Sequence, residues 1–80
     1  MQTITMTIKK CWLNEILAGT KKIEYRAKSP YWIKRFARIA VPCTLKLISG
    51  YKKDAPHITV EISTIVETST CFELHISRIL

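Results

Sequence analysis

The chain alternates apolar and polar side chains with a period of two in several stretches, and this pattern assigns most of it to β-strands. Near the start, Ile4, Met6 and Ile8 alternate with threonines, and residues 72–77 repeat the pattern near the end. Ile, Val and Thr, whose branched side chains pack well on a pleated surface, fill 24 of the 80 positions. The sequence therefore predicts strands that each bury one face.

Five strands are predicted in all. They cover residues 3–8, 22–27, 43–49, 57–67 and 71–79. In the fourth strand the apolar positions change parity between Ile62 and Ile65, which predicts a β-bulge or a bend. The longest polar connector, residues 50–56, joins the third strand to the fourth.

Two short helices are predicted in the N-terminal half. Trp12, Leu13, Ile16 and Leu17 form one stripe of the first helix, and Gly19 is its natural C-terminal stop. The second helix begins with Ser29 as N-cap and a proline in its first turn. Its expected core-facing residues are Trp32, Ile33, Phe36, Ala37 and Ile39. The predicted fold is α+β, with about five strands in a curled or barrel-like sheet.

A length of 80 residues limits the chain to one folded domain, residues 1–80, because there is no room for two hydrophobic cores. With 48% apolar and 24% charged residues, the composition is that of an ordinary globular protein. No apolar run is long enough for a transmembrane helix, and the first residues lack the apolar block of a signal peptide. Cys11, Cys43 and Cys71 are odd in number and widely spaced, which favours buried thiols over disulfides or a zinc site. We expect a cytoplasmic protein with no metal, other cofactor or membrane partner.

Positive charge is concentrated in the first two thirds of the sequence. The net charge is +7 overall, but residues 1–53 carry +10 and residues 54–80 carry −3. Such an asymmetry is typical of a surface that meets phosphate groups, where the release of counterions contributes affinity. It is compatible with a basic protein that has no specific ligand.

The segment from Gly19 to Arg26, GTKKIEYR, combines a helix stop, a loop and the start of a strand. On that strand Lys22, Glu24 and Arg26 share one face, so a carboxylate lies between two cations. Lys21 precedes them in the loop, where an amine partly removed from water acts as a base or nucleophile. The alternative is a solvated strand face with weak ion pairs.

The second predicted helix places Tyr31, Arg35 and Arg38 on one face, at positions i, i+4 and i+7. An aromatic ring beside guanidinium groups is the usual means of holding single-stranded nucleic acid. The alternative is an exposed basic helix face.

The remaining polar residues give weaker indications. Tyr51, Lys52 and Lys53 form either the rim of a groove or a lysine-rich loop. His57 and His75 have no cysteine or acid at the spacing of a metal site or a catalytic triad, so we interpret both as surface histidines.

The segment GTKKIEYR fits the pattern G-x-K-x-x-E-x-R, and with it the chain resembles the ASCH domains (activating signal cointegrator homology) of the PUA-like superfamily. The resemblance extends to residues 8–18, to residues 30–36 and to the closing residues 72–80. It implies a small PUA-like β-barrel with flanking helices and a cleft whose floor carries the motif. It also implies binding of RNA or of modified nucleosides.

Some ASCH domains are amidohydrolases that remove an acyl group from the exocyclic amine of cytidine, and others are described as ribonucleases. In the amidohydrolases the motif lysine works with a threonine three positions later and a distant glutamate. The lysine corresponds to Lys21, but Glu24 occupies the threonine position, and nothing in the spacing selects Glu61 or Glu67 as the distant glutamate. If the protein is an enzyme, the resemblance implies that Lys21 and Glu24 are catalytic.

The leading hypothesis is therefore a domain that binds RNA or a nucleotide derivative in a basic cleft. The predicted ligand-binding residues are Lys21, Lys22, Glu24, Arg26, Tyr31 and Arg35. Two alternatives remain: a hydrolase of an acylated nucleoside or of RNA, and a module whose basic face binds a protein partner.

Overall fold

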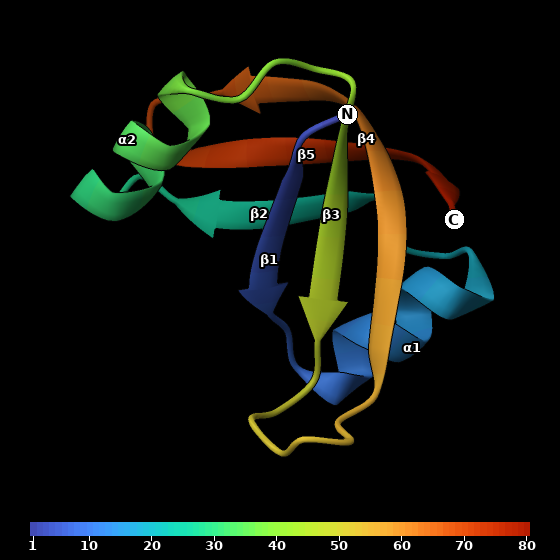
Figure 1. The fold of residues 1–80 in the computed structure, drawn as a ribbon. Helices are drawn as coiled ribbons and strands as arrows, with labels where there is room; N and C mark the ends of the chain where they lie inside the picture. The colour runs from blue at the N-terminus through green and yellow to red at the C-terminus, as the bar shows by residue number, and fades with distance from the viewer.

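One five-stranded sheet with two helices makes up the computed structural model, which describes residues 1–80 (Figure 1). The strands are β1 (Thr3–Thr7), β2 (Ile23–Ala27), β3 (Cys43–Ile48), β4 (His57–Glu67) and β5 (Cys71–Ile79). The helices are α1 (Lys10–Ala18) and α2 (Pro30–Ala37). The predicted α+β class, the five strands and the two helices are confirmed, and the strand ends differ from the predicted ones by one residue at most.

The sheet has the order β1-β3-β4-β5-β2, so β1 and β2 are its two edges. β1 runs parallel to β3, and the other neighbouring pairs are antiparallel. Figure 1 shows β1 and β3 side by side with β4 antiparallel to them, while β5 and β2 cross these three strands, so the sheet curls into a half-barrel. The curl brings the two edge strands towards each other.

Strand β4 makes this curl possible because it belongs to both halves of the sheet. Its first part pairs with β3 up to Ile62, and its later part pairs with β5. The register shifts on both sides of Ile62, which confirms the bulge predicted from the change of apolar parity before Ile65.

Both helices begin and end close to the predicted residues. Gly19 ends α1 in the left-handed conformation, with φ of 81°, which glycine adopts without steric cost. Ser29 caps α2, since its side chain accepts a hydrogen bond from the Trp32 amide at 3.4 Å. The helices have nine and eight residues, and neither is long and apolar enough to cross a membrane.

The core fills the inner face of the half-barrel with alternate residues of every strand but β2. Leu45, Val60 and Ile62 are fully buried at its centre, where β3 and β4 meet. α1 contributes Leu13 and Ile16, so each of its two turns anchors one side chain. The core as a whole comprises fourteen apolar residues.

Several side chains expected in the core lie at the surface instead. Trp12 and Leu17 are 43% and 57% exposed, because α1 touches the sheet along a narrower stripe than the sequence indicates. Ile33 and Ala37 are exposed on α2, which anchors itself mainly through Phe36. The expectation of buried thiols holds for Cys43 but is wrong for Cys11, which is exposed on α1.

Candidate functional site

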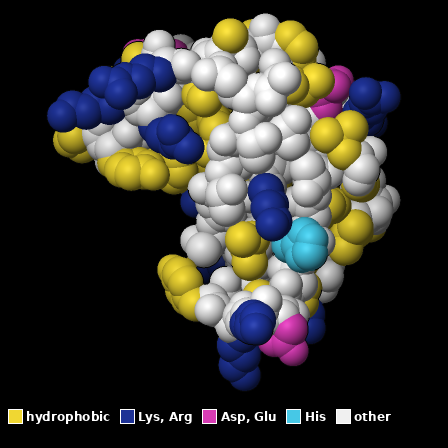
Figure 2. Space-filling view, viewed as in Figure 1, with side chains coloured by type: hydrophobic (Ala, Val, Ile, Leu, Met, Phe, Trp, Pro, Cys, Tyr) yellow, Lys and Arg dark blue, Asp and Glu magenta, His cyan; other side chains and the backbone are white.

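A cavity of about 430 Å³ opens at the seam where the edge strands β1 and β2 approach each other. Figure 2 shows the molecule hollowed on this side, between α2 and the connector that joins β3 to β4. Nine residues from four segments line this cavity, which we call the seam pocket: Thr7, Ile8, Lys9, Trp12, Glu24, Tyr25, Arg26, Gly50 and Tyr51.

The seam pocket faces the unpaired backbone of two edge strands. Directly after β1, the Ile8 amide donates a hydrogen bond to the Ile48 carbonyl of β3. Backbone groups of successive residues point to opposite sides of a strand, so those of Thr7 point away from β3 and into the seam. Directly before β2, the Lys22 carbonyl accepts a hydrogen bond from the Ile76 amide of β5. The backbone groups of the even-numbered residues therefore face β5, and those of Tyr25 face the seam. The protein satisfies these edge groups with its own side chains.

Arg26 ties the two edges together. Its Nη2 donates a hydrogen bond of 2.7 Å to the Thr7 carbonyl oxygen across the seam. Its guanidinium carbon lies 5.9 Å from the centre of the Trp32 ring, so the side chain also contacts α2. The Nε atom of Arg26 is buried and has no hydrogen-bond partner in the protein.

Glu24 provides a buried carboxylate in the wall of the seam pocket. Its exposed fraction is 6%, and the other fourteen buried residues of the chain are apolar. One oxygen, Oε1, accepts a hydrogen bond of 2.9 Å from the Tyr25 amide. The second oxygen, Oε2, is buried without a hydrogen-bond partner, since the Nη2 of Arg26 at 3.8 Å is too distant for one.

Lys21 lies beside this carboxylate, between two aromatic rings. Its Nζ is 4.0 Å from Oε1 of Glu24. The same Nζ lies 5.0 Å from the centre of the Trp12 ring and 5.3 Å from that of Tyr25, so both contacts are cation–π interactions. Trp12 and Tyr25 both line the seam pocket, whereas Lys21 contacts their rings and itself lines a different hollow, of about 280 Å³.

The structure brings three of the six predicted ligand-binding residues together: Lys21, Glu24 and Arg26. Lys22 is exposed and lines a separate hollow of about 280 Å³ with the end of β5. Tyr31 and Arg35 line a third, open hollow of about 220 Å³ on the outer side of α2. The expected carboxylate between cations is present, with Lys21 rather than Lys22 as the second cation.

The sequence analysis did not assign Trp12 and Lys9 to the site. Trp12 matched the apolar stripe of α1, and only its position at the margin of that stripe, beside two lysines, distinguished it from Leu13. Tyr51, a candidate for a groove rim, does line the seam pocket. Nothing in the sequence singles out the Thr7 carbonyl as part of the pocket, because every residue has a backbone carbonyl.

Other titratable groups lie apart from the pocket. His57 is exposed, and His75 contacts Glu73 at 3.3 Å. Burial removes the Cys43 thiol from water and raises its pKa above the ordinary value, so this thiol remains protonated and unreactive. No three His, Cys, Asp or Glu side chains are grouped as a metal site.

Comparison with known proteins adds no family to these observations: no family model matches the chain, and no curated protein or solved structure matches it.

Proposed function

We propose that this protein binds RNA or a nucleotide derivative in the seam pocket, as a PUA-like domain of the ASCH type. The observation that carries the proposal is the carboxylate of Glu24, which is buried in the pocket with one oxygen unpartnered. A location in the cytoplasm belongs to the proposal and accords with three free thiols.

Burial of a carboxylate is costly unless its oxygens are hydrogen-bonded. Glu24 receives one hydrogen bond, and its two ion-pair contacts, to Lys21 and Arg26, are 4.0 and 3.8 Å long. A ligand N–H group that reaches Oε2 satisfies the remaining oxygen. Exocyclic amines and ring N–H groups of nucleobases are donors of this kind, whereas a phosphate offers only acceptors and is repelled by the carboxylate.

Arg26 supplies the complementary group. Its buried Nε is a donor without a partner, and it lies on the same side chain whose Nη2 approaches Oε2 of Glu24 at 3.8 Å. Two side chains that line the pocket therefore hold one acceptor and one donor without partners in the protein. The edge of a nucleobase presents a donor beside an acceptor and matches both.

The rest of the pocket suits the other parts of a nucleotide. Trp12, Tyr25 and Tyr51 supply aromatic surface on which a base can stack, and Lys9 adds a positive charge for a phosphate. The volume of about 430 Å³ lies within the usual range for small-molecule sites. The motif resemblance supports the same site, since α1, the loop and β2 follow one another as the ASCH pattern requires.

The test is a binding experiment with a mixed-sequence single-stranded RNA of ten nucleotides, measured by fluorescence anisotropy across a salt series. Glu24→Gln keeps the shape of the side chain but replaces an acceptor oxygen by a donor. We expect a loss of affinity of tenfold or more, because hydrogen bonds to charged groups contribute about 1.5–3 kcal/mol.

Glu61→Gln is the matched control, since Glu61 is a carboxylate on β4 that is held by Ser77 and Arg78 outside the pocket. Equal affinities of the wild type and both variants would refute the proposal. The same samples are analysed for cleaved RNA and, with N-acetylated cytidine, for released acetate. Product that disappears in Lys21→Ala would assign a hydrolase in place of a binding domain.

A further inference from the structure

We propose that the outer face of α2 is a second binding site, which holds the phosphate backbone of single-stranded RNA, so that the ligand is a strand and not a single nucleotide. This inference rests on the proposed function of the seam pocket. The residues that form the second site, called the α2 face below, are Tyr31, Lys34, Arg35 and Arg38.

The cations of the α2 face are free to meet an external anion. Lys34, Arg35 and Arg38 surround the open hollow of about 220 Å³, and none of them forms an ion pair within the protein. Figure 2 shows Lys and Arg side chains gathered over α2. No acidic residue occurs in the sequence between Glu24 and Asp54.

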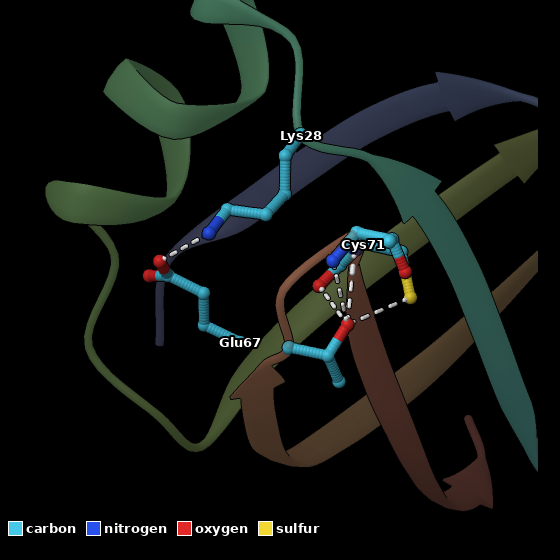
Figure 3. Close-up of polar contacts among 5 residues, drawn as sticks. Lys28, Glu67 and Cys71 are labelled. Atoms are coloured by element: carbon cyan, nitrogen blue, oxygen red, sulfur yellow. Dashed lines mark hydrogen bonds and ion pairs between the residues drawn. The ribbon is translucent and has the colours of Figure 1, made fainter.

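Lys28, which precedes the helix, differs from the cations of the α2 face because it forms an ion pair. Its Nζ lies 2.8 Å from Oε2 of Glu67, so its charge is already paired (Figure 3). The protein therefore neutralises the cation at the start of α2 and leaves the three cations on its outer face unpaired. An external polyanion is the ligand that three neighbouring unpaired cations attract most strongly.

Tyr31 gives the α2 face a surface for a base. Its side chain is 62% exposed, and its ring meets Trp32 edge-on, at 4.7 Å between centres and 90° between planes. The contact with Trp32 holds the ring of Tyr31, and its high exposure leaves ring surface on which a base can stack. A ring beside guanidinium groups favours a nucleic-acid strand over an acidic protein, because it serves bases and phosphates together.

The α2 face is continuous with the seam pocket. Trp32 stands between them, because its ring centre lies 4.7 Å from that of Tyr31 and 5.9 Å from the guanidinium carbon of Arg26. Arg26 in turn lines the seam pocket. A strand with one base in the pocket therefore finds the next ring and the next cations along a path of contacting side chains.

The experiment compares two probes, a mixed-sequence RNA dinucleotide and the ten-nucleotide RNA, on the full chain. The variant Arg35→Gln/Arg38→Gln removes two cations from the α2 face, and Lys46→Gln/Lys53→Gln removes two from the outer side of β3 and from the β3–β4 connector. We expect the first variant to weaken binding of the ten-nucleotide RNA at least tenfold and to leave the dinucleotide within twofold. Its salt slope should fall by about 1.4, since each phosphate contact on a single strand contributes about 0.7.

Tyr31→Ala and Tyr31→Phe separate stacking from charge. Stacking of one base predicts a loss of about 5- to 150-fold for the long RNA in Tyr31→Ala and retention in Tyr31→Phe. Equal losses in the two double variants would mean a general charge effect and would overturn the inference. So would wild-type RNA binding by Arg35→Gln/Arg38→Gln, which is the result expected if the α2 face binds an acidic protein.

Failure of this inference is distinguishable from failure of the proposed function. Glu24→Gln should weaken both probes, whereas changes in the α2 face should weaken only the long one. If Glu24→Gln alone has an effect, the pocket stands and the second site is refuted.

Discussion

The centre of the sheet and its seam bury side chains to a similar extent but with opposite chemistry. At the centre, Leu45, Val60 and Ile62 are fully buried among other apolar side chains. At the seam, Glu24 is 6% exposed and Arg26 retains a buried donor without a partner. Both positions lie on the inner face of the same curled sheet.

The difference shows which burial serves stability and which does not. Apolar burial stabilises the fold in proportion to the area removed from water. A buried carboxylate with a free oxygen contributes nothing comparable, because desolvation opposes it. The seam is therefore the part of the molecule where burial opposes stability, as the proposed ligand site requires.

The largest expected effect is on the centre. Leu45→Ala should lower the free energy of unfolding by about 2–5 kcal/mol, because it leaves a cavity among packed side chains. The measurement is urea denaturation followed by circular dichroism. A loss below 1 kcal/mol would mean that the central strands collapse around the gap. The apolar centre would then contribute less to stability than its comparison with the polar seam requires.

Glu24→Gln should affect RNA binding more than it affects the stability of the fold. We expect the free energy of RNA binding to change by about 1.5–3 kcal/mol and by more than the free energy of unfolding. The two quantities are measured on one preparation, by anisotropy and by urea denaturation. If unfolding is affected more than binding, Glu24 is a structural residue and the comparison between centre and seam collapses.

The pH dependence of the free energy of unfolding tests the burial of Cys43 at the centre of the sheet. Burial raises the pKa of its thiol, so the stability linked to its protonated form is present below the pKa of the unfolded thiol, about 8.5, and is lost as pH rises towards the folded value. We expect the unfolding free energy of the wild type to fall above pH 8.5 more steeply than that of Cys43→Ala. The difference in slope is at most about 1.4 kcal/mol per pH unit, and parallel curves would contradict it.

The smallest expected effect concerns the contact across the seam. Arg26→Lys keeps the positive charge beside Glu24 but loses the forked geometry that reaches the Thr7 carbonyl. We expect a loss of about 1 kcal/mol in unfolding free energy. Hydrogen exchange should become faster in β1 and stay unchanged in β3, and equal acceleration in both strands would show that the contact does not act locally.

The sequence by itself determined the elements and their ends. Alternation fixed the buried face of every strand except β2, where the charged face turns inward. Gly19 and Ser29 marked helix ends, and the change of parity before Ile65 located the bulge. These features depend on residues close together in the chain, so periodicity and capping chemistry predict them. The motif also indicated that Lys21, Glu24 and Arg26 act together, since they lie within six residues.

Only the tertiary structure decided what surrounds that motif. The curl of the sheet brings β1 to β2, which places the Thr7 carbonyl beside Arg26 and the connector residue Tyr51 in the pocket wall. Trp12 leaves the core for the pocket because α1 packs along a narrow stripe. These contacts join residues far apart in sequence, and no local pattern encodes them, because they follow from the way strand pairing closes the sheet.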